Sequence, residues 1–152
     1  MEIREGGLDD PQVVALLQLH LDGMQAHSPP ESVHALDLGR LQQPEIRFWT
    51  AWDQNQLLGC AALREIDAAH GEIKSMRTHP DHLRRGVAAA LLRHILEVAR
   101  ERGYARLSLE TGTGSAFEAA HGLYRRFGFT ECAPLAGYPA GDPFSRFLSR
   151  VL

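Results

Sequence analysis

The stretch from residue 72 to residue 111 constrains the fold of this chain more than any other. It reads EIKSMRT, then a turn with a proline, two arginines and a glycine, then a long apolar-periodic run, and finally ARLSLET. The periodic run predicts an amphipathic helix over residues 86–102, which Gly103 can end. Its apolar face carries Ala88, Leu91, Leu92, Ile95 and Ala99. A strand, a helix and a second strand in this order predict a right-handed crossover between two parallel strands.

The N-terminal part of the chain is expected to be helical after a short first strand, MEIRE. Asp10 precedes Pro11, which is the pattern of an N-cap followed by proline at the first helical position. Apolar residues then recur at helical spacing, so a helix is expected over residues 10–26. Two prolines after it break the helix. A short second helix is expected from about Ser32 to Leu41.

The other elements follow from turn signals and apolar runs. Aromatic and apolar segments on both sides of DQNQ predict a β-hairpin, and EIKSMRT adds a third strand to it. Ser115 and Glu118 form a capping-box signature for a further helix. The expected strands of the hairpin lie near 46–52 and 57–66, the helix over 115–127, and two last strands at FGFTEC and FSRFLSRVL. This order predicts a mixed α/β sheet covered by helices.

Size and composition are those of one globular domain over residues 1–152. No apolar run approaches the roughly 20 residues of a membrane span, and the polar N-terminus is not a signal peptide. The two cysteines do not make a disulfide framework, which indicates a reducing, cytoplasmic setting. A formal net charge of −3 argues against a dedicated nucleic-acid binder. We therefore expect neither a membrane nor a nucleic-acid partner.

The turn HLRRGVA lies between a strand end and a helix start. The first backbone N–H groups of a helix lack internal partners, and the helix dipole makes that end positive. A glycine lets a ligand approach the backbone, and Arg84 and Arg85 add charge, so the turn is a candidate phosphate site. The alternative is a solvated basic turn.

Two motifs in this order resemble the GNAT superfamily of acyl-CoA-dependent N-acyltransferases. The family's pyrophosphate loop reads Gln/Arg-x-x-Gly-x-Gly/Ala, and residues 83–88 of this chain read Leu-Arg-Arg-Gly-Val-Ala. Gly86 and Ala88 match the pattern, while Leu83 departs from it at the first position. The second motif is LYRRFGF at residues 123–129. The resemblance implies a central mixed, mostly antiparallel sheet of about six to seven strands, flanked by about four helices.

The resemblance also implies that acetyl-CoA is the co-substrate. The residues expected to hold its pyrophosphate, mainly through backbone N–H groups, are Leu83, Arg84, Arg85, Gly86, Val87 and Ala88. The main chain of Met76, Arg77 and Thr78 is expected to bind the pantetheine arm. This strand is expected to diverge from its neighbour and leave a wedge for the acyl group. The family often has a cofactor-binding asparagine where this chain has Phe117, so one polar contact is missing or replaced.

Acyl transfer to an amine needs a base for the ammonium proton, a donor that polarises the thioester carbonyl, and an acid for the thiolate. The base candidate is Glu72, which has the strand position and spacing seen in several family members. Strand alternation places it on one face with Lys74, Met76 and Thr78, opposite Ile73, Ser75 and Arg77. The alternative is a carboxylate that is solvated or paired with Lys74 or Arg77.

Tyr124 is the candidate acid, because the family often uses a tyrosine here to protonate the leaving CoA thiolate. The alternative is an ordinary core tyrosine, since it lies on the stripe of Phe117, Ala120 and Phe127. The main-chain N–H near Met76 or Arg77 is the expected carbonyl polariser. Eight histidines are present, but none shows zinc-site spacing, so no metal is expected.

The acceptor side is the least constrained part of the sequence. In this superfamily the region after the first helix borders the acceptor site, which makes Glu31, Ser32 and His34 candidates; the alternative is turn chemistry with Ser32 as an N-cap. Glu110 and Thr111 end a strand beside the wedge and are candidates too. Residues 137–145 are a candidate lid loop.

The sequence thus predicts an N-acetyltransferase that moves an acetyl group from acetyl-CoA directly to a primary amine of a small molecule or amino-acid-like acceptor. Two alternatives stay open, a non-catalytic acyl-CoA-binding module and acetylation of a protein N-terminus or lysine. A homodimer also stays open, since dimerisation is common in such folds.

Overall fold

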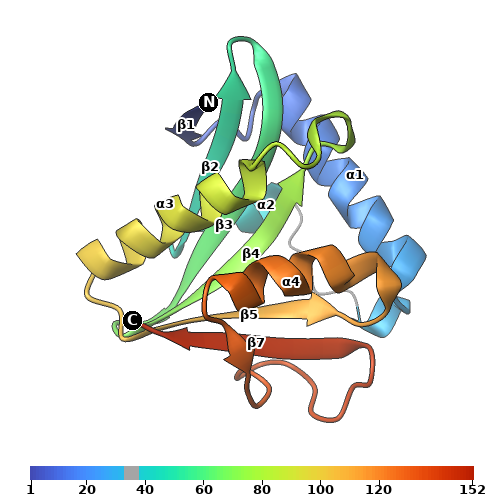
Figure 1. Cartoon of the computed structure of the whole chain (residues 1–152), viewed down its shortest axis with the longest axis vertical. Helices are drawn as coiled ribbons and strands as arrows, with labels where there is room; N and C mark the ends of the chain where they lie inside the picture. Colours follow the sequence, from blue (N-terminus) through green and yellow to red (C-terminus); the bar gives the residue numbers. More distant parts are fainter. Residues whose placement is uncertain (33–37) are drawn as a thin grey trace.

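The predicted strand–helix–strand unit is present and supplies the parallel pair of an otherwise antiparallel sheet (Figure 1). The structure is a computed structural model that describes residues 1–32 and 38–152. Its sheet has seven strands in the order β1-β2-β3-β4-β5-β7-β6. They are β1 (Glu2–Glu5), β2 (Ile46–Asp53), β3 (Gln56–Asp67), β4 (His70–Thr78), β5 (Arg106–Gly112), β6 (Thr130–Glu131) and β7 (Ser145–Val151). The prediction of a mixed, mostly antiparallel sheet is confirmed.

Four α-helices and three short 3-10 turns complete the described part of the chain. The α-helices are α1 (Pro11–His27), α2 (Leu38–Leu41), α3 (Val87–Glu101) and α4 (Glu118–Arg126). The 3-10 turns are η1 (Pro30–Ser32), η2 (Pro80–His82) and η3 (Ser115–Phe117). Asp10 caps α1 by accepting a hydrogen bond from the Gln12 backbone N–H, as its position before Pro11 predicts.

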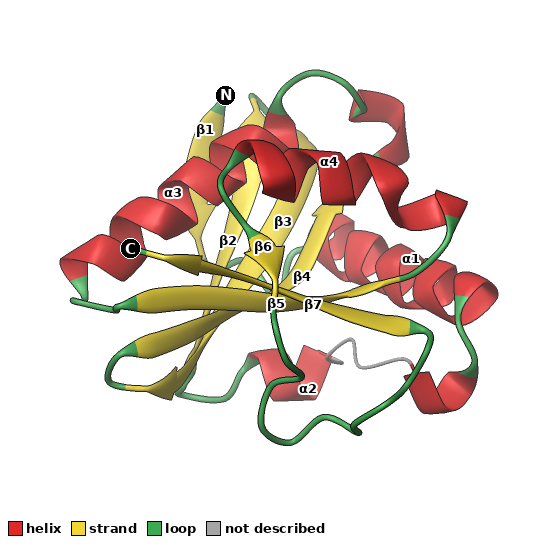
Figure 2. Cartoon of the chain, turned by 60° about the horizontal axis from the view of Figure 1, so that its bottom comes forward, coloured by secondary structure: helices red, strands yellow, loops and turns green. Residues whose placement is uncertain are grey.

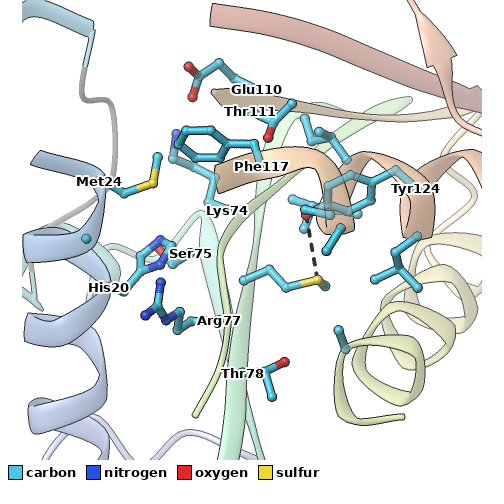
Figure 3. Close-up of a pocket in the computed structure, with 18 of the residues that line it drawn as sticks. His20, Met24, Lys74, Ser75, Arg77, Thr78, Glu110, Thr111, Phe117 and Tyr124 are labelled. Atoms are coloured by element: carbon cyan, nitrogen blue, oxygen red, sulfur yellow. Dashed lines mark hydrogen bonds between the residues drawn. The ribbon is translucent and has the colours of Figure 1, made fainter. Parts of the chain in front are cut away.

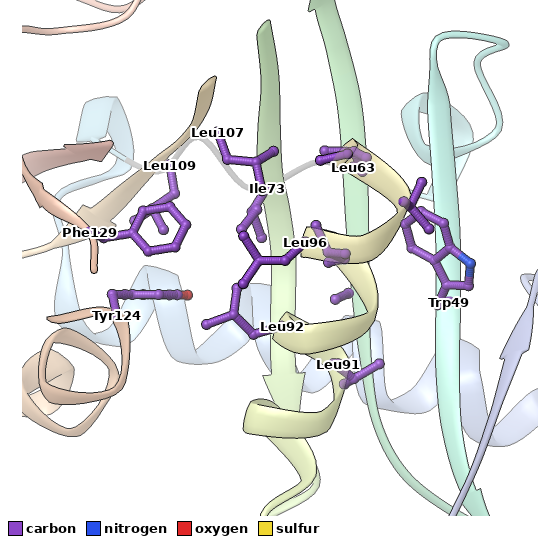
Figure 4. Packing of buried hydrophobic residues seen from close by; sticks show 14 of the residues in the cluster. Trp49, Leu63, Ile73, Leu91, Leu92, Leu96, Leu107, Leu109, Tyr124 and Phe129 are labelled. Atoms are coloured by element: carbon purple, nitrogen blue, oxygen red, sulfur yellow. The ribbon is translucent and has the colours of Figure 1, made fainter. Parts of the chain in front are cut away.

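Helices cover both faces of the sheet (Figure 2). One apolar cluster joins α3 and α4 to the strands through Leu92, Tyr124 and Ile73, among others (Figure 4). A second cluster joins α1 and α2 to the opposite face, with Val13 and Leu41 packed near Trp52. Burying each large apolar side chain contributes about 1.5–3 kcal/mol, so the two clusters hold the layers together and fix where the strands end.

The helix predicted over residues 86–102 is α3, with an apolar stripe wider than expected. Leu91, Leu92, Ile95 and Ala99 are all buried, as predicted. Leu96 and Val98 are buried as well, because α3 packs against β2, β3 and β4 together. The extra width indicates that this helix lies across the sheet rather than along a single strand.

The predicted alternation along β4 is wrong after Lys74, because a β-bulge interrupts the strand. Ser75 has a φ of 54°, and the β3–β4 register shifts at this point. A bulge inserts one extra residue, so later side chains change face. Met76 therefore packs against the α3 side together with Ile73. Arg77 instead lies against Gly23 of α1, and it shares that side of the sheet with Glu72 and Lys74.

Two local predictions need correction. The capping box does not form: Ser115 lies within η3, whose N-cap is Gly114, and neither η3 nor α4 has a side-chain cap. Of the predicted strand FGFTEC, only Thr130–Glu131 form a strand, which is β6. The residues before it differ because Phe127 is the C-cap of α4 and Gly128 turns the chain with a φ of 84°. The helix predicted from Ser32 to Leu41 lies partly outside the described residues, which contain its first residue, at the end of η1, and its last turn, which is α2.

Candidate functional site

A cavity of about 530 Å³ lies where β4 and β5 separate. The two strands pair only from His70 with Arg106 to Ile73 with Leu109. Beyond that point β5 continues to pair with β7, and β4 continues to pair with β3. The expected divergence of this strand from its neighbour is therefore confirmed, and the cavity lies between α1, α4 and the separated strand ends.

Nine of the candidate residues line this cavity. They are Glu72, Met76, Arg77, Thr78, Leu83, Ala88, Glu110, Thr111 and Tyr124. Arg84, Arg85, Gly86 and Val87 belong to the turn next to it and are not among the lining residues. Because Ala88 is in the first turn of α3, the cavity reaches the N-terminus of that helix.

The turn before α3 has the geometry of an open backbone loop. Arg84 and Gly86 both have positive φ, 61° and 79°. No side chain caps α3, and a β-carbon placed on Gly86 would have no heavy atom within 4 Å. The Arg85 guanidinium donates to His82 Nδ1 at 2.7 Å and lies 3.6 Å from Asp53. Exposed N–H groups at an uncapped helix start are suited to bind phosphate.

The backbone of β4 opposite this turn offers further hydrogen-bonding groups. Met76, Arg77 and Thr78 lie beyond the last β4–β5 pair, so their main-chain groups on that edge have no strand beside them. The β3 backbone approaches Arg77 closely on the other edge, where a β-carbon on Gly59 would lie 2.8 Å from the Arg77 carbonyl oxygen. The free edge faces the cavity side of the strand, where an extended ligand chain can pair with it.

Glu72 is fully buried in a network of three side chains. Its carboxylate accepts hydrogen bonds from Arg64 at 3.0 Å, from Lys74 at 3.4 Å and from the Tyr138 hydroxyl at 2.5 Å. Lys74 also donates to the Tyr138 hydroxyl at 2.6 Å. The alternative that Glu72 is a solvated carboxylate is wrong, because the side chain is buried. The cations that pair with Glu72 are Lys74 and Arg64 rather than Arg77.

Tyr138 comes from the segment that was a candidate lid loop. It lines the cavity, and its ring packs edge-to-face on Phe147. Burial, together with the nearby Glu72 carboxylate, raises the pKa of Tyr138, so its phenol stays protonated. The position in a loop rich in glycine and proline gave no sequence signal for this contact.

Tyr124 lies on α4 with its hydroxyl directed into the cavity (Figure 3). The side chain is buried, and the hydroxyl donates to Met76 Sδ at 3.8 Å, a weak acceptor. Burial raises the pKa of Tyr124 to about 12. The ring packs against Phe129, so Tyr124 has both the core contact and the cavity position that the two sequence interpretations describe separately.

The sequence analysis does not predict the α1 wall of the cavity. His20, Gly23, Met24 and His27 all line it. Their spacing of three, four and seven residues puts them on one face of α1, a signal the sequence already contained. Burial, and then the charge of Arg77, lower the pKa of His20 to about 4, so its imidazole is neutral at pH 7.

The candidate acceptor residues divide into three groups. Glu110 and Thr111 line the cavity, and Glu110 accepts a hydrogen bond from Ser145 at 2.8 Å. Glu31 and Ser32 are not among the lining residues; Ser32 is buried and donates to Asp142 at 2.6 Å, which joins η1 to the loop after β6. His34 lies outside the described residues.

Phe117 is the residue for which the sequence analysis predicts that a polar cofactor contact is missing or replaced. Its ring lines the cavity and covers Gly112, where a β-carbon would come within 2.4 Å of the ring.

Within residues 1–32 and 38–152, no group of three histidine, cysteine or acidic side chains could hold a metal ion. Over the same residues, no helix has the length and apolar character to cross a bilayer.

Comparison with known proteins gives a consistent answer. Residues 13–129 match the family model described as the acetyltransferase (GNAT) family. The chain is 53% identical to the N-acetyltransferase YsnE of Bacillus subtilis, covering 100% of both chains. It is also 53% identical to the N-acetyltransferase YedL of Escherichia coli, covering 99% of this chain and 94% of the relative.

Solved structures agree with this result. An acyl-CoA N-acyltransferase from Klebsiella pneumoniae superposes with a TM-score of 0.82 at 28% identity, covering 99% of this chain and 97% of that one. A GNAT family acetyltransferase from Elizabethkingia anophelis with acetyl-CoA bound has the same fold, with a TM-score of 0.71 at 20% identity and coverage of 99% and 97%. This chain therefore belongs to the GNAT family, and it is an acyl-CoA-dependent N-acetyltransferase.

Proposed function

We propose that this enzyme transfers an acetyl group from acetyl-CoA directly to the primary amine of a small, amino-acid-like acceptor. One observation carries the proposal: a single cavity extends from the uncapped start of α3, through the gap between β4 and β5, to the α1 side of the sheet. A cofactor that enters at α3 and an acceptor that enters beside α1 would meet at the separated strands.

Both cysteines are free, which favours a reducing, cytoplasmic setting.

The cofactor would bind along the turn and the free edge of β4. Backbone N–H groups of residues 83–88 would hold the pyrophosphate, with charge from Arg84 and Arg85. The main chain of Met76, Arg77 and Thr78 would pair with the pantetheine arm, because no strand occupies that edge. This arrangement leaves the thioester near the point where β4 and β5 separate.

Proton transfer would use the two sides of the cavity. Glu72 would accept a proton from the acceptor's ammonium group, and the free amine nitrogen would then attack the thioester carbonyl carbon. The carbonyl oxygen would be stabilised by a main-chain N–H near Met76 or Arg77. As the C–S bond breaks, the nitrogen would lose its second proton to solvent water and an amide would form. The CoA sulfur would gain one proton from a protein acid, which solvent would then reprotonate.

Tyr124 would supply the proton for the sulfur. With a pKa of about 12 the phenol keeps its proton over the neutral range. It would first donate a hydrogen bond to the developing thiolate, and would yield the proton as negative charge forms there. The weak bond to Met76 Sδ is easily exchanged for one to the cofactor's sulfur.

The function is tested by a panel of primary amines scored for CoA release. The panel includes amino acids, their carboxamides, simple alkylamines and a lysine-containing peptide, each with acetyl-CoA and purified enzyme. The proposal expects thiol release above background with small amines and an N-acetylated product by mass spectrometry. Release only with the peptide would contradict the small acceptor.

Tyr124→Phe separates the catalytic role from core packing. The substitution removes only the hydroxyl, and because its partner is a weak sulfur acceptor, the melting temperature is expected to change little. Turnover is expected to fall about 10-fold, less than the ~10²–10⁴ typical of a full general acid, since water can also protonate a thiolate. The measurement is kcat with acetyl-CoA affinity followed by calorimetry. Unchanged turnover with weakened CoA binding would move Tyr124 to the cofactor site.

A further inference from the structure

Three buried polar atoms without a hydrogen-bond partner lie together on the α1 side of the cavity. They belong to His20 (Nδ1), Ser75 (Oγ) and Arg77 (Nε), and Figure 3 shows the three side chains grouped between α1 and β4. Among the described residues only His94 Nε2, on α3, is a further buried atom of this kind. Buried polar groups are nearly always hydrogen-bonded, so this grouping indicates a wall that binds a polar part of a ligand.

The bulge in β4 creates this grouping. Ser75 has a φ of 54° and is more than nine-tenths buried, an unusual backbone conformation for a residue other than glycine. Without the extra residue, Arg77 would point to the α3 side of the sheet. With it, the guanidinium lies against α1, where a β-carbon on Gly23 would be 3.4 Å from Nη1. Backbone strain of this kind concentrates at functional sites.

The wall carries a positive charge that no carboxylate of residues 1–32 or 38–152 balances. Lys74 is already bound by Glu72 and Tyr138. In the part of the chain that the structure describes, Arg77 makes no ion pair with a carboxylate. His20 beside it is neutral at pH 7, because burial lowers the pKa of its imidazole. A guanidinium in a cavity, with a neutral imidazole and a hydroxyl next to it, is suited to a planar anion.

We propose that this wall is a carboxylate-binding subsite, in which Arg77, Ser75 and His20 hold the carboxylate of an amino-acid acceptor. The proposal rests on the proposed function and deepens it by naming the group that the acceptor carries besides its amine. Glu72 and Ser75 both lie on β4, so the amine of a bound amino acid can face Glu72 while the carboxylate faces Arg77. Met24 and Phe117 line the same cavity and offer apolar surface to the acceptor's side chain.

The test compares each amino acid of the panel with its carboxamide. The pairs keep the amine and the side chain and differ in the carboxylate. Because the two amines differ in basicity, the readout is the ratio of kcat/KM between a variant and the wild type for the same acceptor. Arg77→Met keeps a long unbranched side chain and removes the charge. It is expected to lower kcat/KM for the best amino acid by roughly 30-fold, mainly through KM, and to change the value for its carboxamide by less than about 2-fold.

Arg100→Met is the matched control, since it makes the same charge change at an exposed position in the last turn of α3. Its kcat/KM values are expected to equal those of the wild type. Equal losses of kcat/KM for the amino acid and its carboxamide in Arg77→Met would overturn the subsite. So would a loss of CoA affinity in calorimetry, because Arg77 would then serve the cofactor.

A second measurement keeps the subsite separate from the proposed function. N-acetyl amino acids carry the carboxylate without a reactive amine, and their binding to the wild type and to Arg77→Met is measured by calorimetry. If no amine of the panel releases thiol, the proposed function fails, yet binding that depends on Arg77 would still support the subsite. If amines are acetylated and N-acetyl amino acids bind both proteins equally or neither protein, the function stands and the subsite is refuted.

Discussion

Gly86→Asp is expected to abolish CoA binding, with an affinity loss of at least ~100-fold. Gly86 precedes the uncapped first turn of α3, where a phosphate would accept hydrogen bonds from backbone N–H groups. A carboxylate at this point competes for the same N–H groups and repels the phosphate. The fold is expected to survive, because a β-carbon on Gly86 meets open space and aspartate tolerates left-handed backbone better than most residues. Calorimetry with CoA gives the affinity, and the melting temperature reports the fold.

Gly86→Asn is the matched control for this prediction. Asparagine has nearly the size of aspartate and also tolerates positive φ, but it is neutral. Its affinity loss is expected to be much smaller than that of Gly86→Asp, and raising the salt concentration is expected to narrow the difference. If both variants lose CoA equally, the backbone conformation rather than charge controls binding. If neither does, the turn is not the phosphate site.

The layout of the sheet was predictable because its signals are local. The periodic run of α3 between two strand-like segments defines the parallel crossover, and turn residues such as Asp10 and Gly103 mark helix ends. Each of these signals depends on residues that are close to one another in the sequence. The position of the turn at residues 83–88, where we propose that the cofactor binds, followed in the same way, since it is fixed by the junction between β4 and α3.

The acceptor side was not predictable to the same degree, because long-range contacts build it. Strand alternation put Arg77 on the wrong face, since nothing in the sequence around Ser75 marks a bulge. Tyr138 reaches Glu72 across 66 residues of sequence, and such a pairing depends on how the β6–β7 connection folds back. The α1 residues that line the cavity lie at helical spacing and were detectable in principle. However, residues on the packing face of a helix have the same spacing. Core and cavity residues on one helix give the same periodic signal.

Glu72 illustrates how strand position alone does not reveal the environment of a side chain. Its strand position and spacing favoured a base, and the alternative was a carboxylate that is solvated or paired with Lys74 or Arg77. The structure instead buries it with Arg64, Lys74 and Tyr138. The same contacts also stabilise the fold, so any test must separate turnover from stability.

Glu72→Gln is expected to lower turnover by ~10²–10⁴ at neutral pH with CoA affinity preserved. The amide keeps the shape of the side chain but cannot take the ammonium proton. Because it also leaves Arg64 and Lys74 facing a neutral group, stability is expected to fall by about 1–3 kcal/mol. The defect in turnover is expected to shrink as the pH rises, since the acceptor amine then loses its proton to solvent and needs no base. The measurement is kcat against pH, normalised to the folded fraction.

Tyr138→Phe provides the comparison that makes this test decisive. It removes one hydrogen bond to Glu72 but leaves the carboxylate, its two cations and the ring contact with Phe147. If Glu72 is the base, Tyr138→Phe is expected to lose less than about 10-fold in turnover, with no comparable recovery at high pH. If Glu72 only anchors the loop, both variants would lose stability together. The folded fraction of Glu72→Gln would then turn over at the wild-type rate at neutral pH, and the base would have to be sought elsewhere in the cavity.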